Sequence, residues 1–169
     1  MIQIYTGNGK GKTTAALGLA LRALGHNKKV FLIQFLKKGA CSGELKAAKR
    51  FKGFKVWQTG PGVRVSASRP TLKNKLLVQK GLKLARKVLA GKEYDLVILD
   101  ELNVALKCGL LRLSHVKELL QAAEKDVELV LTGRGAHPQI IKAADLVSEI
   151  KEIRHYYKKG LGPRAGIEY

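Results

Sequence analysis

Glycine and lysine are concentrated in one segment near the start of the chain, which reads Thr6-Gly7-Asn8-Gly9-Lys10-Gly11-Lys12-Thr13-Thr14. Apart from its first residue, the segment follows the GxxxxGK[ST] spacing of a phosphate-binding loop, or P-loop. Glycines let backbone N–H groups turn toward phosphate oxygens at close range, and the start of the following helix favours anions. We therefore expect residues 7–14 to bind a nucleotide, with the Lys12 ammonium bridging phosphate oxygens and the Thr13 hydroxyl ligating Mg²⁺. The alternative, a glycine-rich turn that only links two elements, is disfavoured because a strand and a helix flank the segment.

Two polar side chains near this loop allow two interpretations each. Lys10 adds a further cation inside the loop, which either neutralises triphosphate or points to solvent. Gln34 stands near the end of an apolar strand, where it either lines the nucleotide site or satisfies a neighbouring backbone group. We include both among the candidate nucleotide-binding residues.

An apolar run, Leu96-Val-Ile-Leu99, delivers two carboxylates, Asp100 and Glu101. This arrangement is typical of a Walker B segment, in which a strand brings a carboxylate to the Mg²⁺ opposite the P-loop. An aspartate at a strand end can also cap a helix, but with a P-loop present the metal role is favoured. The sequence does not decide which of the two carboxylates contacts the metal.

The segment Thr132-Gly133-Arg134-Gly135 follows another apolar run and offers a guanidinium suited to bidentate phosphate binding. The alternative is an ion-paired arginine in a turn. Lys12, Thr13 and Arg134 are the residues that we expect to act on the reacting nucleotide.

Alternating strands and helices are expected to position these side chains. The order of apolar, amphipathic and glycine-rich segments predicts strands at residues 2–5, 29–35, 54–57, 94–99, 127–132 and 145–154. It predicts helices at residues 13–24, 43–51, 71–89, 114–124 and 138–143. The helix at 13–24 is apolar almost all round and is expected to pack deeply. This order predicts an α/β protein of the P-loop NTPase type, with a mostly parallel sheet covered by helices on both faces. Ligands of such sheets bind at the carboxyl ends of the strands, where the three motifs fall.

Composition narrows the class of protein. The 169 residues fit a single domain, residues 1–169, with 46% hydrophobic and 27% charged residues. No apolar run approaches the roughly 18–20 residues that span a bilayer, and neither a secretory signal nor a disulfide pattern is evident, so we expect a cytoplasmic protein without membrane contact. The net charge of +19 indicates either a polyanionic partner or, as we favour, a strongly solvated surface.

Several motifs in matching order make the chain resemble the P-loop type of ATP:corrinoid (cob(I)alamin) adenosyltransferases. They are Thr6–Ala16, Gln34-Phe35 with Lys37, Leu99–Leu102, Thr132–Gly135, Ala144-Asp145 with Val147–Glu149, and Gly166–Tyr169. The resemblance covers nearly the whole chain.

The resemblance implies that ATP donates its 5′-deoxyadenosyl group to the cobalt(I) of a reduced corrinoid and that tripolyphosphate leaves. It implies ATP and corrinoid as substrates, Mg²⁺ as cofactor, and a nucleotide lying reversed in the P-loop compared with ordinary ATPases. By the same resemblance, residues 7–13 bind ATP, Thr13 with Asp100 or Glu101 holds Mg²⁺, and Arg134 belongs to the site. A flavoprotein reductant and a homodimer are also implied.

The sequence departs from the family pattern in two places. Members carry a segment before the P-loop strand, with a helix that covers the active site across a dimer, and this sequence begins at the strand. Members also place aromatic residues in the loop that here reads Thr59-Gly60-Pro61-Gly62-Val63-Arg64.

Three other functions compete with adenosyl transfer. A RecA-like ATPase acting on nucleic acid would use the P-loop and the positive charge, but only 6% of the residues are aromatic and available for stacking on bases. A small nucleotide kinase would release ADP. A non-catalytic protein that binds ATP or carries a corrinoid would require no turnover.

Overall fold

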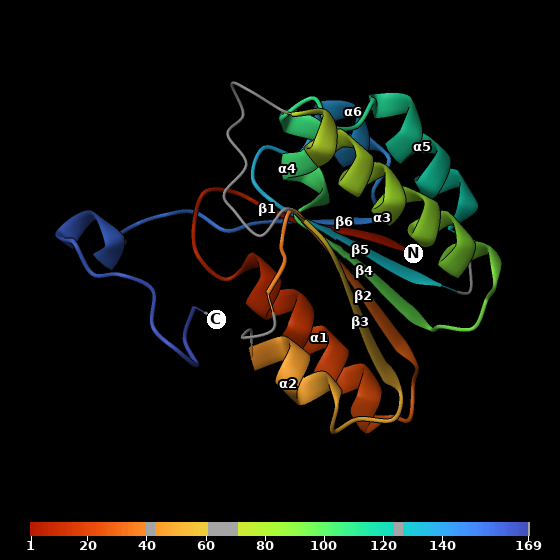
Figure 1. Cartoon of the computed structure of the whole chain (residues 1–169), viewed down its shortest axis with the longest axis horizontal. Coiled ribbons are helices and arrows are strands. Elements are labelled where there is room, and N and C mark those ends of the chain that lie inside the picture. Colours follow the sequence, from red (N-terminus) through yellow and green to blue (C-terminus); the bar gives the residue numbers. More distant parts are fainter. Residues whose placement is uncertain (40–42, 61–70, 124–126, 169) are drawn as a thin grey trace.

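The computed structural model of the chain describes residues 1–39, 43–60, 71–123 and 127–168. Six strands in these ranges form one sheet in the order β3-β2-β4-β5-β1-β6, and every neighbouring pair is parallel (Figure 1). Their bounds are β1 Ile2–Thr6, β2 Val30–Phe35, β3 Phe54–Thr59, β4 Leu96–Asp100, β5 Glu128–Thr132 and β6 Leu146–Glu149. The predicted α/β class with a parallel sheet is confirmed.

Helices cover both faces of the sheet. In Figure 1, α1 (Lys12–Gly25) and α2 (Gly43–Ala48) lie on one face. The other face carries α3 (Leu72–Ala90), α4 (Leu102–Lys107), α5 (Leu113–Ala122) and α6 (Pro138–Lys142). A 3₁₀ helix, η1 (Tyr156–Lys159), lies in the segment after β6, which runs out from the sheet and returns toward the start of α1.

The two faces of the sheet have separate apolar cores because alternate residues of a strand point to opposite sides. Ile98 packs toward α1, together with Leu32 and Val130. Its neighbour Leu99 packs toward the helices of the opposite face. Every residue of β2 and β4 is buried, which explains why these strands are nearly continuous apolar runs in the sequence.

The parallel arrangement brings the ends of three strands to one edge. Tyr5 of β1 pairs with Thr132 of β5, and Leu99 of β4 pairs with Leu131 of β5. The P-loop, the Asp100–Glu101 corner and the segment 133–135 therefore leave the sheet side by side. Because a sheet of this kind binds its ligands at this edge, we take it as the place of the functional site.

Three local predictions were wrong. Helix α1 buries only Lys12, Ala16 and Ala20, and Leu21 keeps 59% of its surface exposed. The small side chains of the buried stripe let the helix lie close to the sheet while its outer face stays uncovered. Helix α4 was missed because it follows directly on the carboxylate corner, and β6 covers only Leu146–Glu149 of the predicted residues 145–154.

In the described parts of the chain, no helix is both long and apolar enough for a bilayer span.

Candidate active site

The P-loop is packed against the residues that follow β6. Gly7 has a φ of 96°, and a Cβ placed on it would come within 2.4 Å of the carbonyl oxygen of Ile150. The backbone N–H of Gly9 donates a hydrogen bond of 2.7 Å to the same oxygen. A side chain at position 7 would therefore force the loop away from the sheet edge, so this contact helps to set the shape of the loop.

Lys12 is the first residue of α1, and only 8% of its surface is exposed. Its ammonium donates a hydrogen bond of 2.6 Å to the carbonyl oxygen of Gly9 within the loop. Burial lowers the pKa of Lys12, and the positive charge of Arg134 adds to this effect. An anion in the loop would supply the counter-charge that a buried ammonium needs.

Asp100 is fully buried behind the loop and accepts hydrogen bonds from four side chains. Its Oδ1 accepts from the hydroxyls of Thr13 and Thr132, each at 2.7 Å. Its Oδ2 accepts from the Lys37 ammonium at 2.9 Å and from the Gln34 amide at 3.2 Å. Asp100 therefore ties the P-loop to the ends of β2 and β5.

The next residue, Glu101, has a left-handed backbone conformation with a φ of 62°. This conformation is uncommon for a residue other than glycine. It is stabilised by a hydrogen bond of 3.0 Å that the N–H of Glu101 donates to the Thr132 hydroxyl. The turn separates the two carboxylates, because Asp100 faces the sheet end whereas Glu101 lines the open cavity. Burial raises the pKa of Glu101, and the negative charge of Asp100 raises it further.

The C-terminal segment closes the outer side of the loop. The Lys10 ammonium donates a hydrogen bond of 3.1 Å to the carbonyl oxygen of Ile167 and lies 3.9 Å from the Glu168 carboxylate. Glu168 is in turn held by the hydroxyl of Tyr156 and by Arg164. These bonds lower the pKa of Glu168 to about 2, so its carboxylate is ionised beside Lys10 at neutral pH.

These groups surround a cavity of about 440 Å³, within the size range of small-molecule sites. Its charged lining side chains are four cations and three carboxylates: Lys10, Lys12, Lys37, Arg134, Glu44, Glu101 and Glu168. The backbone of the loop and the start of α1 form its floor. The cavity thus combines a glycine-rich loop, a buried lysine and a hydroxyl fixed by a carboxylate, which together can hold a nucleoside triphosphate.

Most of the candidate residues meet at this cavity. Gly9, Lys10, Gly11, Lys12, Thr13, Thr14, Glu101 and Arg134 line it. Asp100 binds the lining residue Thr13, and Gln34 binds Asp100. Gly7 packs against the backbone of Ile150. Asn8 is exposed and does not line the cavity.

The contacts of three side chains bear on the alternatives that the sequence left open. Lys10 lines the cavity and binds the C-terminal segment, so it does not simply point to solvent. Gln34 donates to carboxylates and not to a backbone group. Arg134 forms no ion pair within the described residues, which argues against its interpretation as an ion-paired turn residue.

Sequence reasoning gave no role to several residues of the site. Lys37 and Thr132 both bind Asp100, and Glu44 and His155 line the cavity. Lys37, Thr132 and Gly166 belong to motifs that carry the family resemblance, but their contacts in the site were not predicted. No sequence pattern identifies Glu44 or His155, because both reach the site only through the tertiary fold. Residues 61–64, in the loop where the family resemblance implies aromatic residues, lie outside the described residues.

The residues present fit a magnesium ion bound together with a nucleotide. Mg²⁺ is usually held by one or two protein oxygens, substrate phosphates and water. The Thr13 hydroxyl and the Glu101 carboxylate both line the cavity, and Asp100 fixes the Thr13 hydroxyl from behind. No cluster of three or more His, Cys, Asp or Glu side chains suited to a metal occurs in the described ranges, but a site completed by phosphates does not require one.

Comparison with known proteins gives concordant matches over the whole chain. A family model described as ATP:corrinoid adenosyltransferase BtuR/CobO/CobP matches residues 1–169. The corrinoid adenosyltransferase of Pseudomonas aeruginosa is 37% identical over 179 residues, which cover 100% of this chain and 83% of that protein. The corrinoid adenosyltransferase CobA of Salmonella typhimurium is 36% identical over 100% of this chain and 85% of that protein.

The fold also occurs in a more distant protein. A crystal structure of a KaiC-like protein from Pyrococcus horikoshii matches with a TM-score of 0.60 over 90% of this chain and 73% of that chain. Its sequence identity of 13% means that this match concerns the fold alone.

Proposed function

This chain belongs to the ATP:corrinoid adenosyltransferase family, and we propose that its P-loop holds the triphosphate of ATP as the leaving group of the adenosyl transfer. The protein transfers the adenosyl group of ATP to a corrinoid, and both are its substrates. The main observation behind this proposal is the hydrogen bond of 2.7 Å from the Thr13 hydroxyl to the Asp100 carboxylate, because it fixes the P-loop hydroxyl against the end of β4. The RecA-like ATPase on nucleic acid is not favoured.

The proposed chemistry needs no nucleophile from the protein. The electron pair of cobalt(I) attacks C5′ of ATP, the cobalt–carbon bond forms, and the bond between C5′ and its oxygen breaks. The electron pair of that bond leaves with tripolyphosphate, so negative charge develops along the whole phosphate chain. Groups that stabilise this charge lower the barrier, and fixed donors and cations do so most effectively where water is excluded.

Lys12 is the cation best placed for this task. Its ammonium now donates to the Gly9 carbonyl, and a small rotation would turn it toward a phosphate in the cavity. Arg134 faces the same cavity from the end of β5 and can bind a phosphate through two N–H groups. We propose that these two cations neutralise the leaving group and that the backbone N–H groups of residues 10–13 position it, since the N–H of Gly9 is bound to Ile150.

We propose that Thr13 and Glu101 hold Mg²⁺ and that Asp100 orients Thr13 without being the first ligand. This assignment is supported by the position of Glu101 in the cavity lining and of Asp100 behind it. A bound Mg²⁺ adds positive charge to the phosphate oxygens as they leave.

Further proposals concern the molecule as a whole. All six described strands lie in one sheet, which supports a single functional domain over residues 1–169. We propose that the protein acts in the cytoplasm as a homodimer and receives electrons for the corrinoid from a flavoprotein. These last proposals rest on the family resemblance.

The decisive experiment mixes the protein with ATP, Mg²⁺ and a chemically reduced corrinoid. We expect the visible spectrum of a cobalt–carbon bond and one tripolyphosphate for each product molecule. A Lys12→Ala variant should lose about 10²- to 10³-fold in rate, as expected for loss of one group that stabilises developing charge. Lys80→Ala, on the exposed side of α3, is the matched control and should keep its rate.

Two results would contradict the proposal. Full adenosyl transfer by Lys12→Ala would exclude the assigned role of the P-loop lysine. Formation of ADP and phosphate only after addition of nucleic acid would instead support the ATPase function.

A further inference from the structure

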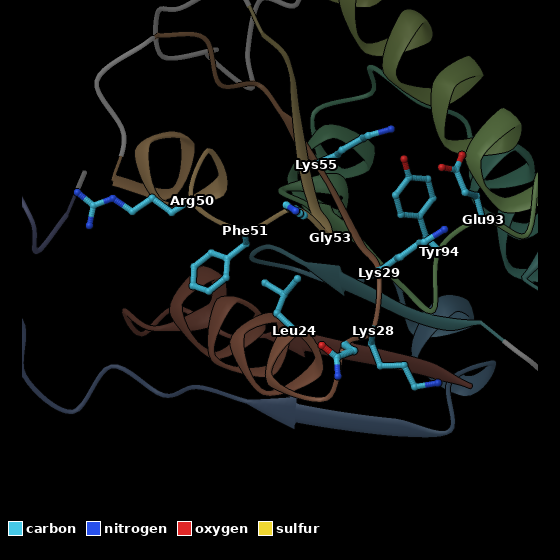
Figure 2. A pocket seen from close by; sticks show the side chains of 11 residues that line it. Leu24, Lys28, Lys29, Arg50, Phe51, Gly53, Lys55, Glu93 and Tyr94 are labelled. Carbon is cyan, nitrogen blue, oxygen red and sulfur yellow. The ribbon is translucent and has the colours of Figure 1, made fainter.

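A second cavity, of about 500 Å³, lies where strands β2, β3 and β4 begin. Because the strands are parallel, this is the edge of the sheet opposite to the P-loop. Its lining comes from Leu24 near the end of α1 and from the segments 27–29, 50–53 and 93–94, with Lys55 of β3 (Figure 2). None of these residues belongs to the nucleotide site described above.

Backbone hydrogen bonds connect the segments that line this cavity. The N–H of Val30 donates to the carbonyl of Gly53 at 2.8 Å, and the N–H of Asp95 donates to the carbonyl of Lys29 at 2.9 Å. The N–H of Lys29 donates in turn to the carboxylate of Asp95 at 2.8 Å. The segments before β2, β3 and β4 are therefore held together without a ligand, as is typical of preformed small-molecule sites.

The charge of this cavity is more one-sided than that of the nucleotide site. Its lining has five cations and one carboxylate: Lys28, Lys29, Arg50, Lys52, Lys55 and Glu93. The nucleotide cavity has four cations and three carboxylates in its lining. The second cavity is thus the more strongly positive of the two, and adenosyl transfer gives no reason for that charge.

Few of these cations are neutralised by the protein itself. Lys28 pairs with Asp95 at 3.0 Å. Over the part of the chain that the structure describes, neither Lys29, Arg50 nor Lys52 forms an ion pair. An anion that binds here would therefore gain counter-charges without breaking existing pairs, apart from that of Lys28.

Apolar side chains complete the lining. Figure 2 shows Phe51 beside Leu24 on one side and the ring of Tyr94 with Lys29 on the other. Phe51 keeps 40% of its surface exposed, although it is a large apolar residue. The Lys55 ammonium lies 5.8 Å from the centre of the Tyr94 ring, a cation–π contact. A flat apolar group could pack on Phe51 and Leu24 while an attached anion meets the lysines.

We propose that this cavity binds a small phosphate-bearing molecule that also carries an aromatic group, at a site separate from the P-loop. The phosphate is bound by Lys29, Lys52 and Lys55, and the aromatic group packs against Phe51. This site lies beyond the family's adenosyl transfer, and its ligand is not a reactant of that transfer.

The test uses the full chain with Lys12→Ala to weaken the nucleotide site, and AMP as the probe. Titration calorimetry should show one AMP bound per chain. The added substitutions Lys29→Ala, Lys52→Ala and Lys55→Ala should raise its Kd at least about tenfold, since each good contact to a charged group is worth a factor of this order. The matched control, Lys80→Ala with Lys83→Ala and Lys87→Ala, removes the same charge from the exposed side of α3 and should leave the Kd nearly unchanged.

A second comparison tests the aromatic part of the proposal. Phe51→Ala, again with Lys12→Ala, should weaken the binding of AMP but leave the binding of inorganic phosphate unchanged. Equal weakening of AMP binding by the two triple-lysine variants would overturn the proposal, because it would show general attraction to a basic surface. No saturable binding, or binding that the cavity variant leaves intact, would also overturn it.

Discussion

Replacing Asp100 by asparagine would remove the charge of a fully buried carboxylate and keep its shape. The carboxylate accepts four hydrogen bonds, two at each oxygen. An asparagine offers one acceptor oxygen and one N–H₂ donor, so two of the four donors must rotate away or lose their partner. In every arrangement the Lys37 ammonium loses the carboxylate with which it forms an ion pair.

The expected loss of stability follows from these contacts. Removing one partner of a buried ion pair costs about 3–5 kcal/mol, and a hydrogen bond to a charged group is worth about 1.5–3 kcal/mol. The Lys37 side chain is 36% exposed, so water partly replaces the lost carboxylate. We therefore expect Asp100→Asn to lower the free energy of unfolding by about 2–3 kcal/mol, below the value for a fully buried pair. For a chain of this length, that loss corresponds to a Tm lower by about 4–12 °C.

The assay is urea unfolding followed by circular dichroism at neutral pH, with Asp95→Asn as the control. Asp95 also pairs with a lysine, but the side chains of Lys28 and Asp95 are 57% and 42% exposed. An asparagine keeps one oxygen that can still accept the bond from the Lys29 N–H. Since exposed pairs contribute about 0.2–1 kcal/mol, the control should lose no more than about 1 kcal/mol. If Asp100→Asn were as stable as Asp95→Asn, the reasoning that makes Asp100 the link between the P-loop and the sheet would be refuted.

Three further predictions concern the metal, the loop and the C-terminal segment. Glu101→Gln should weaken the Mg²⁺ dependence of ATP binding. Because burial raises the pKa of Glu101, the affinity of the wild-type protein for Mg²⁺ should fall as the pH decreases through that raised pKa. The variant should lose this pH dependence, and an unchanged pH profile would contradict the assignment. Gly7→Ala should lower both the Tm and the affinity for ATP, because the new Cβ would meet the backbone of Ile150. The control Gly18→Ala lies in open space on α1 and should stabilise the protein by up to about 1 kcal/mol through better helix propensity. Equal thermal stability of the two variants would argue against the packing of the loop on Ile150. Glu168→Gln should tighten ATP binding at low salt, because it removes a carboxylate from an anion site and from the neighbourhood of Lys10. The effect should be smaller at high salt. Calorimetry would measure the Kd for ATP, and weaker binding by the variant would show that the C-terminal segment contributes to binding instead.

The sequence was most informative where function depends on local chain geometry. Glycines, Lys12 and Thr13 form one loop between a strand and a helix, so their spacing alone predicts a phosphate site. The strands β2 and β4 are covered on both faces, and this burial appears directly as apolar runs. Asp100 could be placed at the same edge as the loop because parallel strands end together.

Other predictions were wrong because local pattern and tertiary environment disagree. The apolar composition of α1 suggested deep burial, but a helix buries only the stripe that faces the sheet, here Ala16 and Ala20. Helix α4 begins directly after the left-handed Glu101, and the sequence has no separate signal for its start.

By itself, the sequence determined a parallel α/β fold with a P-loop, and the likeness of its motifs indicated the family. Only the tertiary structure decided where the two carboxylates lie, with Asp100 bound to four side chains and Glu101 lining the cavity. It also brought Lys37 and the C-terminal segment to the loop and formed the basic cavity at the opposite edge. These features join residues far apart in the chain, and such contacts depend on how the elements pack, which no local spacing records.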